Sequence, residues 1–202
     1  NTGAIFGGED KDDNLISCTE LFSSYCLTTL CSSLPVWSGA AAMIAGRRYA
    51  CGSGTTSAFL ASGGRPNAPA SGGLTCVEEY NGTTWTGGGC LSNARNGAGV
   101  AGTQKATFSA GGENAPTHLN YSLTEEYDGT SWSAGGNLII ARRNIPGAGT
   151  LTAGVVVAGI GASTCSSVEE YNGTSWASGT SVNTARHGGV ASGTQNATLN
   201  HI

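Results

Sequence analysis

Four tryptophans mark a repeating unit, and this periodicity restricts the fold more than any other feature of the sequence. The clearest copies read VEEYNGTTW, TEEYDGTSW and VEEYNGTSW, and a degraded copy near the start consists of CTELF followed, after an insertion, by VW. Self-similarity at a nearly constant spacing indicates an array of equal supersecondary units. Each Trp is followed after ten residues by an Arg, so the four units share one frame. The repeated landmarks are Trp37, Trp85, Trp132 and Trp176, with Arg47, Arg95, Arg142 and Arg186.

Each unit reads as four short strands. A run of small residues after the arginine leads through a GT turn into a second strand that ends at glycines, as in KATFSAGG. A variable loop precedes the EEY strand, and an NGT or DGT turn connects that strand to a last one that starts at Trp. Asn-Gly and Asp-Gly predict a two-residue hairpin with both central residues at positive φ. A sheet of four strands cannot bury its faces alone, so the units are expected to stack radially.

Composition favours an all-β chain and argues against several classes of function. The chain has 33 Gly, and only 11% of its residues are charged, which is unlike the strongly charged composition of disordered segments. A net charge of −4, with nine Lys and Arg spread along the chain, argues against a nucleic-acid partner. No window of 18 consecutive apolar residues occurs, so no membrane insertion is expected.

The order of these landmarks resembles the kelch motif: an Arg, an apolar strand ending in Gly-Gly, a strand with Glu and Tyr, and then Trp. The chain is also similar to the Gly- and Thr-rich kelch-like arrays (EEYNGTSW, AR, GTQ) found in environmental and phage sequences. The resemblance covers nearly the whole chain. It implies an all-β fold, a four-bladed kelch-like β-propeller of four-stranded antiparallel sheets.

The two ends of the chain carry complementary parts of one unit. NTGAIFGG at the start reads as a second strand with its diglycine, whereas the last copy supplies Arg186 and reaches the same strand at 196–202. We therefore expect a single domain, 1–202, with blade A shared by 1–37 and 186–202. Closure of the ring within one chain and head-to-tail complementation between chains are both open. The remaining blades are expected at 47–85 (B), 95–132 (C) and 142–176 (D).

The repeated polar residues are interpreted as scaffold. Adjacent residues of a strand point to opposite faces, so the paired carboxylates cannot converge on one substrate. One Glu of each pair is expected to accept a bond from a repeat arginine, and the arginines are expected to bridge blades. The tryptophans are assigned to packing between blades. The glutamates assigned to the structural repeat are Glu79, Glu126 and Glu170.

No catalytic constellation is recognisable. The three His are dispersed, no CxxC pair occurs, and the many GxG strings are turn composition, so we expect no enzyme activity, no cofactor and no metal. Seven Cys favour an oxidising compartment, and Cys26–Cys31 is the candidate disulfide because both lie in one irregular segment. N-glycosylation sequons occur at Asn81, Asn120, Asn172 and Asn196. Asn120 is the preferred site, because turn chemistry alone accounts for the Asn at 81 and at 172.

These observations favour a non-enzymatic, extracellular structural protein, a self-associating subunit of a fibre or virion surface. The alternative is a glycan- or receptor-binding propeller module, such as a lectin or a tail-fibre tip. Discrete monomers that bind glycans would favour the alternative.

Overall fold

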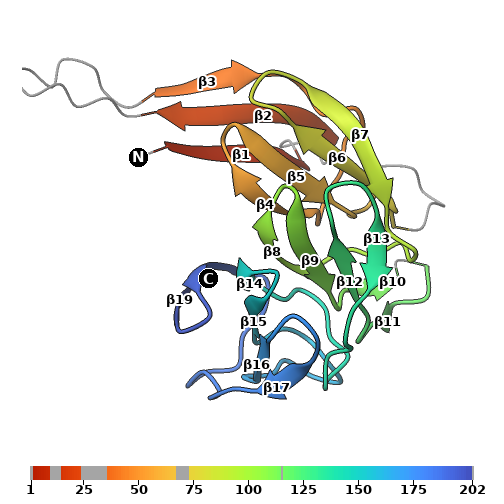
Figure 1. Ribbon diagram of the computed structural model, residues 1–202, viewed down its shortest axis with the longest axis vertical. Helices are drawn as coiled ribbons and strands as arrows, with labels where there is room; N and C mark the ends of the chain where they lie inside the picture. Colours follow the sequence, from red (N-terminus) through yellow and green to blue (C-terminus); the bar gives the residue numbers. More distant parts are fainter. Residues whose placement is uncertain (1, 10–14, 24–35, 67–72, 115, 202) are drawn as a thin grey trace, which may run out of the picture.

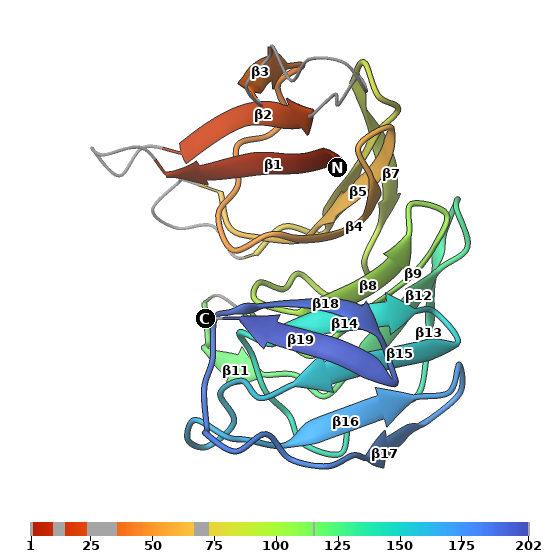
Figure 2. The same cartoon turned by 90° about the vertical axis from the view of Figure 1, so that its left-hand side faces the viewer.

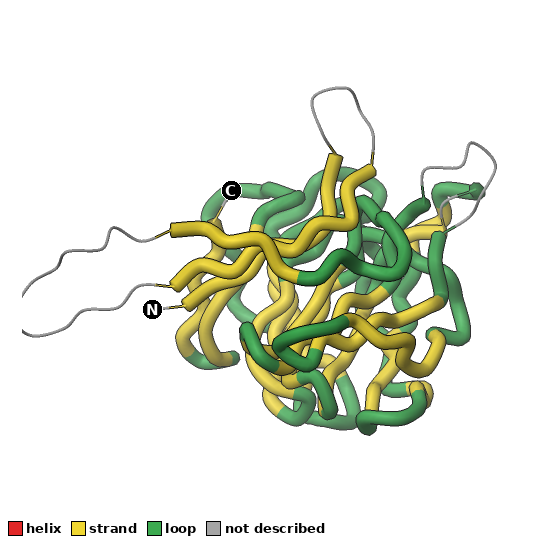
Figure 3. The backbone as a smooth tube through the Cα atoms, turned by 90° about the horizontal axis from the view of Figure 1, so that it is seen from above, coloured by secondary structure: helices red, strands yellow, loops and turns green. Residues whose placement is uncertain are grey.

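The computed structural model of the protein describes residues 2–9, 15–23, 36–66, 73–114 and 116–201. In these ranges every regular element is a β-strand, and Figure 3 shows strands joined by loops with no helix. The all-β class predicted from the sequence is therefore confirmed. The described ranges contain no helix with the length and apolar character needed to cross a membrane.

Three repeats each form an antiparallel sheet of four strands, which we call sheets B, C and D. In each sheet the strands lie in the order in which they follow along the chain. Sheet B contains β4 (Cys51–Thr55), β5 (Ala58–Ser62), β6 (Cys76–Tyr80) and β7 (Trp85–Cys90); sheet C contains β8 (Gly99–Thr103), β9 (Ala106–Ala110), β12 (Thr124–Tyr127) and β13 (Trp132–Ala134); sheet D contains β14 (Gly147–Thr150), β15 (Ala153–Val157), β16 (Val168–Tyr171) and β17 (Trp176–Ser178). A two-stranded hairpin, β10 (Glu113–Asn114) and β11 (Leu119–Asn120), lies in the variable loop of sheet C.

The hairpins between the third and fourth strands differ in one detail from the prediction. The Asn81 backbone N–H bonds the Thr84 carbonyl, so the two central residues are Gly82 and Thr83, one position later than expected. Only Gly82 has a positive φ, 92°, as a type II′ turn requires. The Asn81 side-chain oxygen accepts from the N–H groups of Thr83 and Thr84 at 2.9 and 2.8 Å. The Asx residue therefore caps the turn from outside it, and Asp128 and Asn172 do the same in sheets C and D.

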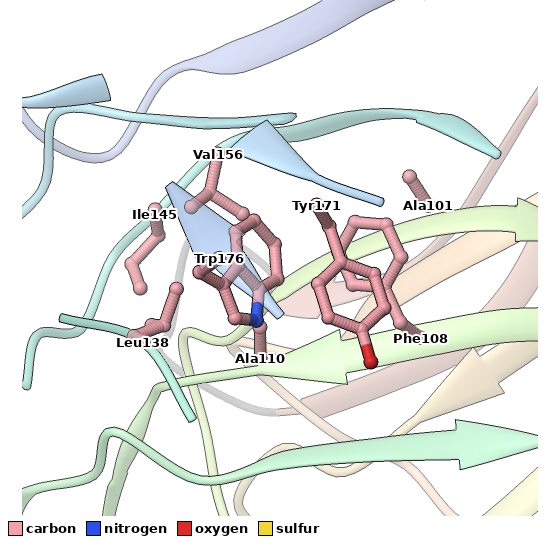
Figure 4. Close-up of a cluster of buried hydrophobic side chains, with 8 residues drawn as sticks. All are labelled: Ala101, Phe108, Ala110, Leu138, Ile145, Val156, Tyr171 and Trp176. Carbon is pink, nitrogen blue, oxygen red and sulfur yellow. The ribbon is translucent and has the colours of Figure 1, made fainter. Parts of the chain in front are cut away.

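Consecutive sheets pack face to face around an arc, with the chain running from red to blue in Figure 1. Phe108 of sheet C contacts Trp176 of sheet D edge-to-face, with ring centroids 5.4 Å apart. Figure 4 shows this apolar cluster, to which sheet C contributes Ala101, Phe108 and Ala110. Close approach needs small residues: a Cβ on Gly154 would lie 2.3 Å from the Phe108 ring. Gly154, on the second strand of sheet D, thus lets an aromatic ring of the neighbouring sheet reach the backbone.

The two ends of the chain form separate units. The N-terminal sheet contains β1 (Thr2–Glu9), β2 (Leu15–Ser23) and β3 (Val36–Ala40), and the C-terminal hairpin contains β18 (Val190–Thr194) and β19 (Ala197–His201). In Figures 1 and 2 the N-terminal sheet is at the top and the hairpin is in the lower half. Among the described strands, β1 pairs only with β2, and β19 only with β18. The described strands therefore show no pairing between 1–37 and 186–202, the two parts of the expected shared blade. β1 and β19 correspond to the same strand of the repeat, and each occupies that position in its own sheet.

Candidate functional site

A buried arginine lies just before the first strand of each of sheets B, C and D and is hydrogen-bonded within that sheet. The Arg95 Nη2 lies 2.5 Å from Glu125 Oε1, and its Nη1 donates to the Leu123 carbonyl at 2.9 Å. The other Glu125 oxygen accepts from the Ser92 N–H at 2.7 Å. A buried charge is tolerated only when it is paired and hydrogen-bonded, and this network meets both conditions. The equivalent ion pairs are Arg47–Glu78 and Arg142–Glu169.

These pairs differ from the prediction in two respects. The arginine side chains bind within their own sheet. The main-chain carbonyls of the arginines bridge to the preceding sheet, where they accept from the second glycine of the diglycine; the Gly64 N–H donates to the Arg95 carbonyl at 2.9 Å. The partner is also the first Glu of each pair. Glu79, Glu126 and Glu170 are the second members, and none of them contacts a repeat arginine among the described residues.

The second Glu of sheets B and C binds the tyrosine of the next sheet instead. The Tyr127 hydroxyl donates to Glu79 Oε1 at 2.7 Å, and Tyr171 donates in the same way to Glu126. Burial, together with this hydrogen bond to a carboxylate, raises the pKa of both Tyr127 and Tyr171 to about 12. Lys105 Nζ also lies 2.5 Å from Glu79 Oε2. Sequence reasoning missed these links, although the EEY order of the three clear copies contains both partners.

The repeat tryptophans lie between neighbouring sheets. Each of Trp85, Trp132 and Trp176 packs on the tyrosine of its own sheet, with ring centroids 4.7–5.1 Å apart. Each indole Nε1 donates to the unit before it: Trp132 bonds the Gly89 carbonyl at 3.2 Å, and Trp176 bonds Thr124 Oγ1 at 3.0 Å. Trp37 lies on β3, opposite Phe22, and its side chain is outside the described part of the structure.

Two equivalent glutamines hydrogen-bond to the sheet that precedes their own unit: one links sheet C to sheet B, and the other links the C-terminal hairpin to sheet D. The Gln104 amide donates to the carbonyls of Phe59 and Tyr80 at 3.0 and 2.7 Å. Gln195 donates to the carbonyls of Gly154 and Tyr171 at 2.9 and 3.0 Å. The hairpin is therefore seated in the place that a next sheet of the array would take. The GTQ string, present in only these two units of the sequence, was the signal for this contact.

Four equivalent segments converge on one cavity. A space of about 210 Å³ is lined by parts of 49–51, 97–98, 144–145 and 188–189, which occupy the same positions of the four repeats. Their leading residues, Tyr49, Gly97, Asn144 and Gly188, all have a left-handed backbone, with φ between 51 and 75°. The N–H of Gly97 bonds the carbonyl of Tyr49, and that of Gly188 bonds Asn144. The four segments that line the cavity thus share one backbone conformation at their leading residues.

A groove lies between sheet D and the C-terminal hairpin, with a volume of about 500 Å³. Glu170 and Arg186 both line it. Among the described residues Glu170 receives no tyrosine hydroxyl, and the Arg186 side chain makes one bond, Nε to the Thr184 carbonyl at 3.2 Å. The Asn200 amide also lines the groove, and neither of its polar atoms has a hydrogen-bond partner in the described ranges. The groove therefore presents a cation and a carboxylate, each without the partner that its repeat position has elsewhere, and a buried amide without a partner among the described residues.

The same hairpin exposes an apolar residue that is buried in the other units. Leu199 is 64% exposed, whereas Leu60, Phe108 and Val155, at the same repeat position, are at most 2% exposed. In sheets B, C and D these residues pair with the second Glu of the third strand. Leu60 and Phe108 pack on the tyrosine and tryptophan of the next sheet, so the exposure of Leu199 marks a face of the hairpin that no next sheet covers among the described residues.

The N-terminal sheet contains the reciprocal residue. Glu20 is the Cα partner of Ile5, which lies two residues before the diglycine Gly7-Gly8. In the same way Glu78 pairs with Ala61 and Glu125 pairs with Ser109, each two residues before a diglycine. Glu20 hence occupies the register of the arginine-binding Glu. Within the part of the chain that the structure describes, the N-terminal sheet has no strand corresponding to β4, β8 or β14, before which the arginine lies. The fourth arginine of the repeat frame is Arg186, which precedes β18 of the C-terminal hairpin.

The candidate modification sites differ in their surroundings. Asn120 is half-buried, and its Nδ2, the atom to which a glycan would be attached, donates to the carbonyls of Ile160 and Gly161 at 3.2 and 3.0 Å. Asn81 and Asn172 are exposed and use only their oxygens, and Asn196 is exposed on the turn of the C-terminal hairpin. Cys26 and Cys31 lie outside the described residues.

Several ionisable side chains of the described ranges form pairs and small networks. No group of three or more His, Cys, Asp or Glu side chains in these ranges is arranged to hold a metal ion. His118 lies 3.4 Å from Glu113 Oε2, and Arg143 Nε lies 3.2 Å from the same oxygen. No model of a known protein family matches the chain, and no curated protein is significantly similar to it.

Proposed function

We propose that this chain is a non-enzymatic structural protein, a four-bladed kelch-like β-propeller that assembles head to tail. The four-bladed arrangement is supported by the cavity lined by four equivalent segments and by their shared left-handed residues. The absence of enzyme activity is supported by the use of the repeated charged residues: Arg47, Arg95 and Arg142 are buried against carboxylates of their own sheets. An extracellular location, on a fibre or virion surface, is supported by the seven cysteines and the low charge density.

The observation that carries the assembly proposal is that the fourth repeat arginine and a glutamate at the arginine-binding register lie on two different units of the structure. Arg186 lies in the groove of the C-terminal hairpin without a carboxylate among the described residues, and Glu20 lies at the arginine-binding register of the N-terminal sheet. In the proposed contact β19 of one molecule displaces β1 of the next and pairs with β2 in its place, so that Glu20 meets Arg186. Addition of a strand to an exposed edge supplies main-chain hydrogen bonds, and the ion pair supplies register.

Part of this contact is apolar. Phe22 occupies the tyrosine position of β2, so it offers Glu170 no hydroxyl. The valines that line the groove, Val155, Val157 and Val168, supply the surface that a third strand covers. The specificity of the contact therefore depends on Arg186 and Glu20 more than on the Glu–Tyr link used between sheets B, C and D.

Charge reversal tests the contact and separates the two ways of completing the unit. We expect the wild-type chain to form concentration-dependent oligomers in sedimentation velocity, and Glu20→Arg and Arg186→Glu each to abolish them. An equimolar mixture of the two single variants brings the introduced arginine of one molecule opposite the introduced glutamate of another, so it should restore oligomers. The double variant should also oligomerise alone.

Pairing within one chain gives a different pattern, because the double variant would regain stability while a mixture of single variants would stay monomeric. His187→Glu is the matched control: it adds a negative charge beside Arg186, on an exposed side chain, and should leave assembly intact. A wild-type chain that stays monomeric at every concentration, or a mixture that fails to associate, would refute head-to-tail assembly. Monomers that bind a glycan array would instead favour a glycan-binding module.

A further inference from the structure

Two exposed thiols lie opposite each other across the outer hairpin of sheet B. Cys76 begins β6 and Cys90 ends β7, and the two are Cα partners in the antiparallel ladder. Their Sγ atoms are 3.6 Å apart. Directly opposed residues of an antiparallel pair have Cα atoms about 4.5–5.5 Å apart, which lies within the range that a disulfide spans. Closing the remaining ~1.5 Å between the sulfurs needs only small side-chain rotations.

The pair is a local feature of one repeat. The corresponding residues are Leu123 and Asn137 in sheet C and Ser167 and Ser181 in sheet D. The backbone beside the pair is the same in all three sheets, since the Leu91 N–H bonds the Thr75 carbonyl just as Leu138 bonds Ser122 and Val182 bonds Ser166. The backbone therefore does not require cysteines here, and the sheet is already in the register that a disulfide needs.

We propose that Cys76 and Cys90 form a disulfide that staples β6 to β7. A small-molecule disulfide is the oxidant. One protein thiolate attacks a sulfur of that reagent, forming a mixed disulfide and releasing one small thiol; the second protein thiolate then attacks the mixed disulfide and releases the other. The two protein thiols lose two electrons, the reagent gains them, and the two thiol protons end on the two small thiols.

The staple would act where sheet B meets its neighbours. The carbonyl of Cys76 accepts from Arg47 Nη1 at 2.9 Å, and the carbonyl of Gly89, next to Cys90, accepts from Trp132 Nε1 at 3.2 Å. The ladder is irregular between Cys76 and Glu78, so this end of β7 is bulged. A disulfide fixes the bulge that receives Trp132 and the carbonyl that receives Arg47. The inference is independent of the assembly proposal.

Peptide mapping tests the bond directly. The reduced full-length chain is incubated with oxidised glutathione, free thiols are alkylated, and the protein is digested with chymotrypsin. Cleavage after Leu74, Tyr80, Trp85 and Leu91 places the two cysteines on separate peptides, 75–80 and 86–91. We expect these peptides to be recovered joined, about 2 Da lighter than the sum of the two thiol forms, because forming the bond removes two hydrogen atoms.

The double variant Cys76→Ser, Cys90→Ser reproduces the serine pair of sheet D, so it should fold. The oxidised wild type should unfold at a temperature about 6–12 °C above its reduced form. In the double variant, oxidation should no longer raise the unfolding temperature by this amount. Cys165→Ser is the control, and its oxidation should still join 75–80 to 86–91. Recovery of both peptides alkylated and unlinked, or linked to other cysteines, would overturn the proposal.

Discussion

The two adjacent glutamates of sheet C provide a sharp test of how the repeat is stabilised. Glu125 is buried and faces Arg95, whereas Glu126 lies on the opposite face and accepts from Tyr171. Glu125→Gln keeps the shape and a carbonyl acceptor for the Ser92 N–H but removes the counter-charge of a buried guanidinium. Breaking a buried ion pair in this way costs about 3–5 kcal/mol.

Glu126→Gln is the matched control, because it removes the same charge from the next residue of the same strand. Its amide oxygen can still accept from the Tyr171 hydroxyl, so the expected loss is at most about 1 kcal/mol. Burial by itself lowers the pKa of the Arg95 guanidinium, and the Glu125 charge opposes this effect. The Arg95 site is therefore the one that depends on its neighbour for its charge.

Equilibrium unfolding in urea separates the two variants. With a slope of about 2 kcal/mol/M, Glu125→Gln should lower the unfolding midpoint by about 1.5–2.5 M, and Glu126→Gln by about 0.5 M or less. Replacing the pair together, as Arg95→Met with Glu125→Leu, should cost less than the sum of the single losses, because no unpaired charge remains. Equal losses for the two glutamine variants would refute the assignment of the buried anchor to Glu125.

Two further predictions concern pH and modification. The folded-state pKa of Tyr127 and Tyr171 is about 12, above the ordinary value of 10.0. Their hydrogen bonds should therefore contribute fully to stability below pH 10, and this contribution should be lost as the pH rises to about 12. Thermal unfolding at pH 8, 10 and 11.5, together with phenolate absorbance, measures the loss. If the chain is expressed in a glycosylating host, glycopeptide mapping should find higher occupancy at Asn81 and Asn172 than at Asn120, whose Nδ2 is bonded to two carbonyls; full occupancy at Asn120 alone would contradict this prediction.

Local patterns in the sequence were sufficient to predict the strand order of sheets B, C and D. The GT turns, the Asx-Gly turns and the alternation within VEEY each act over a few residues, so they can be read without knowledge of distant contacts. The all-β class and the antiparallel four-stranded sheets followed from these signals. The turn centres were displaced by one residue because the Asx residue lies just before them: its backbone N–H bonds across the turn, and its side-chain oxygen accepts from two N–H groups of the turn.

The sequence by itself determined the repeat, its frame and the residue types at each position, because these depend on local turn chemistry and strand alternation. Only the tertiary structure decided which glutamate of each pair meets the arginine, since the two are identical and their roles depend on which face the neighbouring sheet covers. The same holds for the two ends of the chain. Their strands correspond to one unit in sequence, yet β1 and β19 compete for the same place, so they form two sheets, with Glu20 on one and Arg186 beside the other.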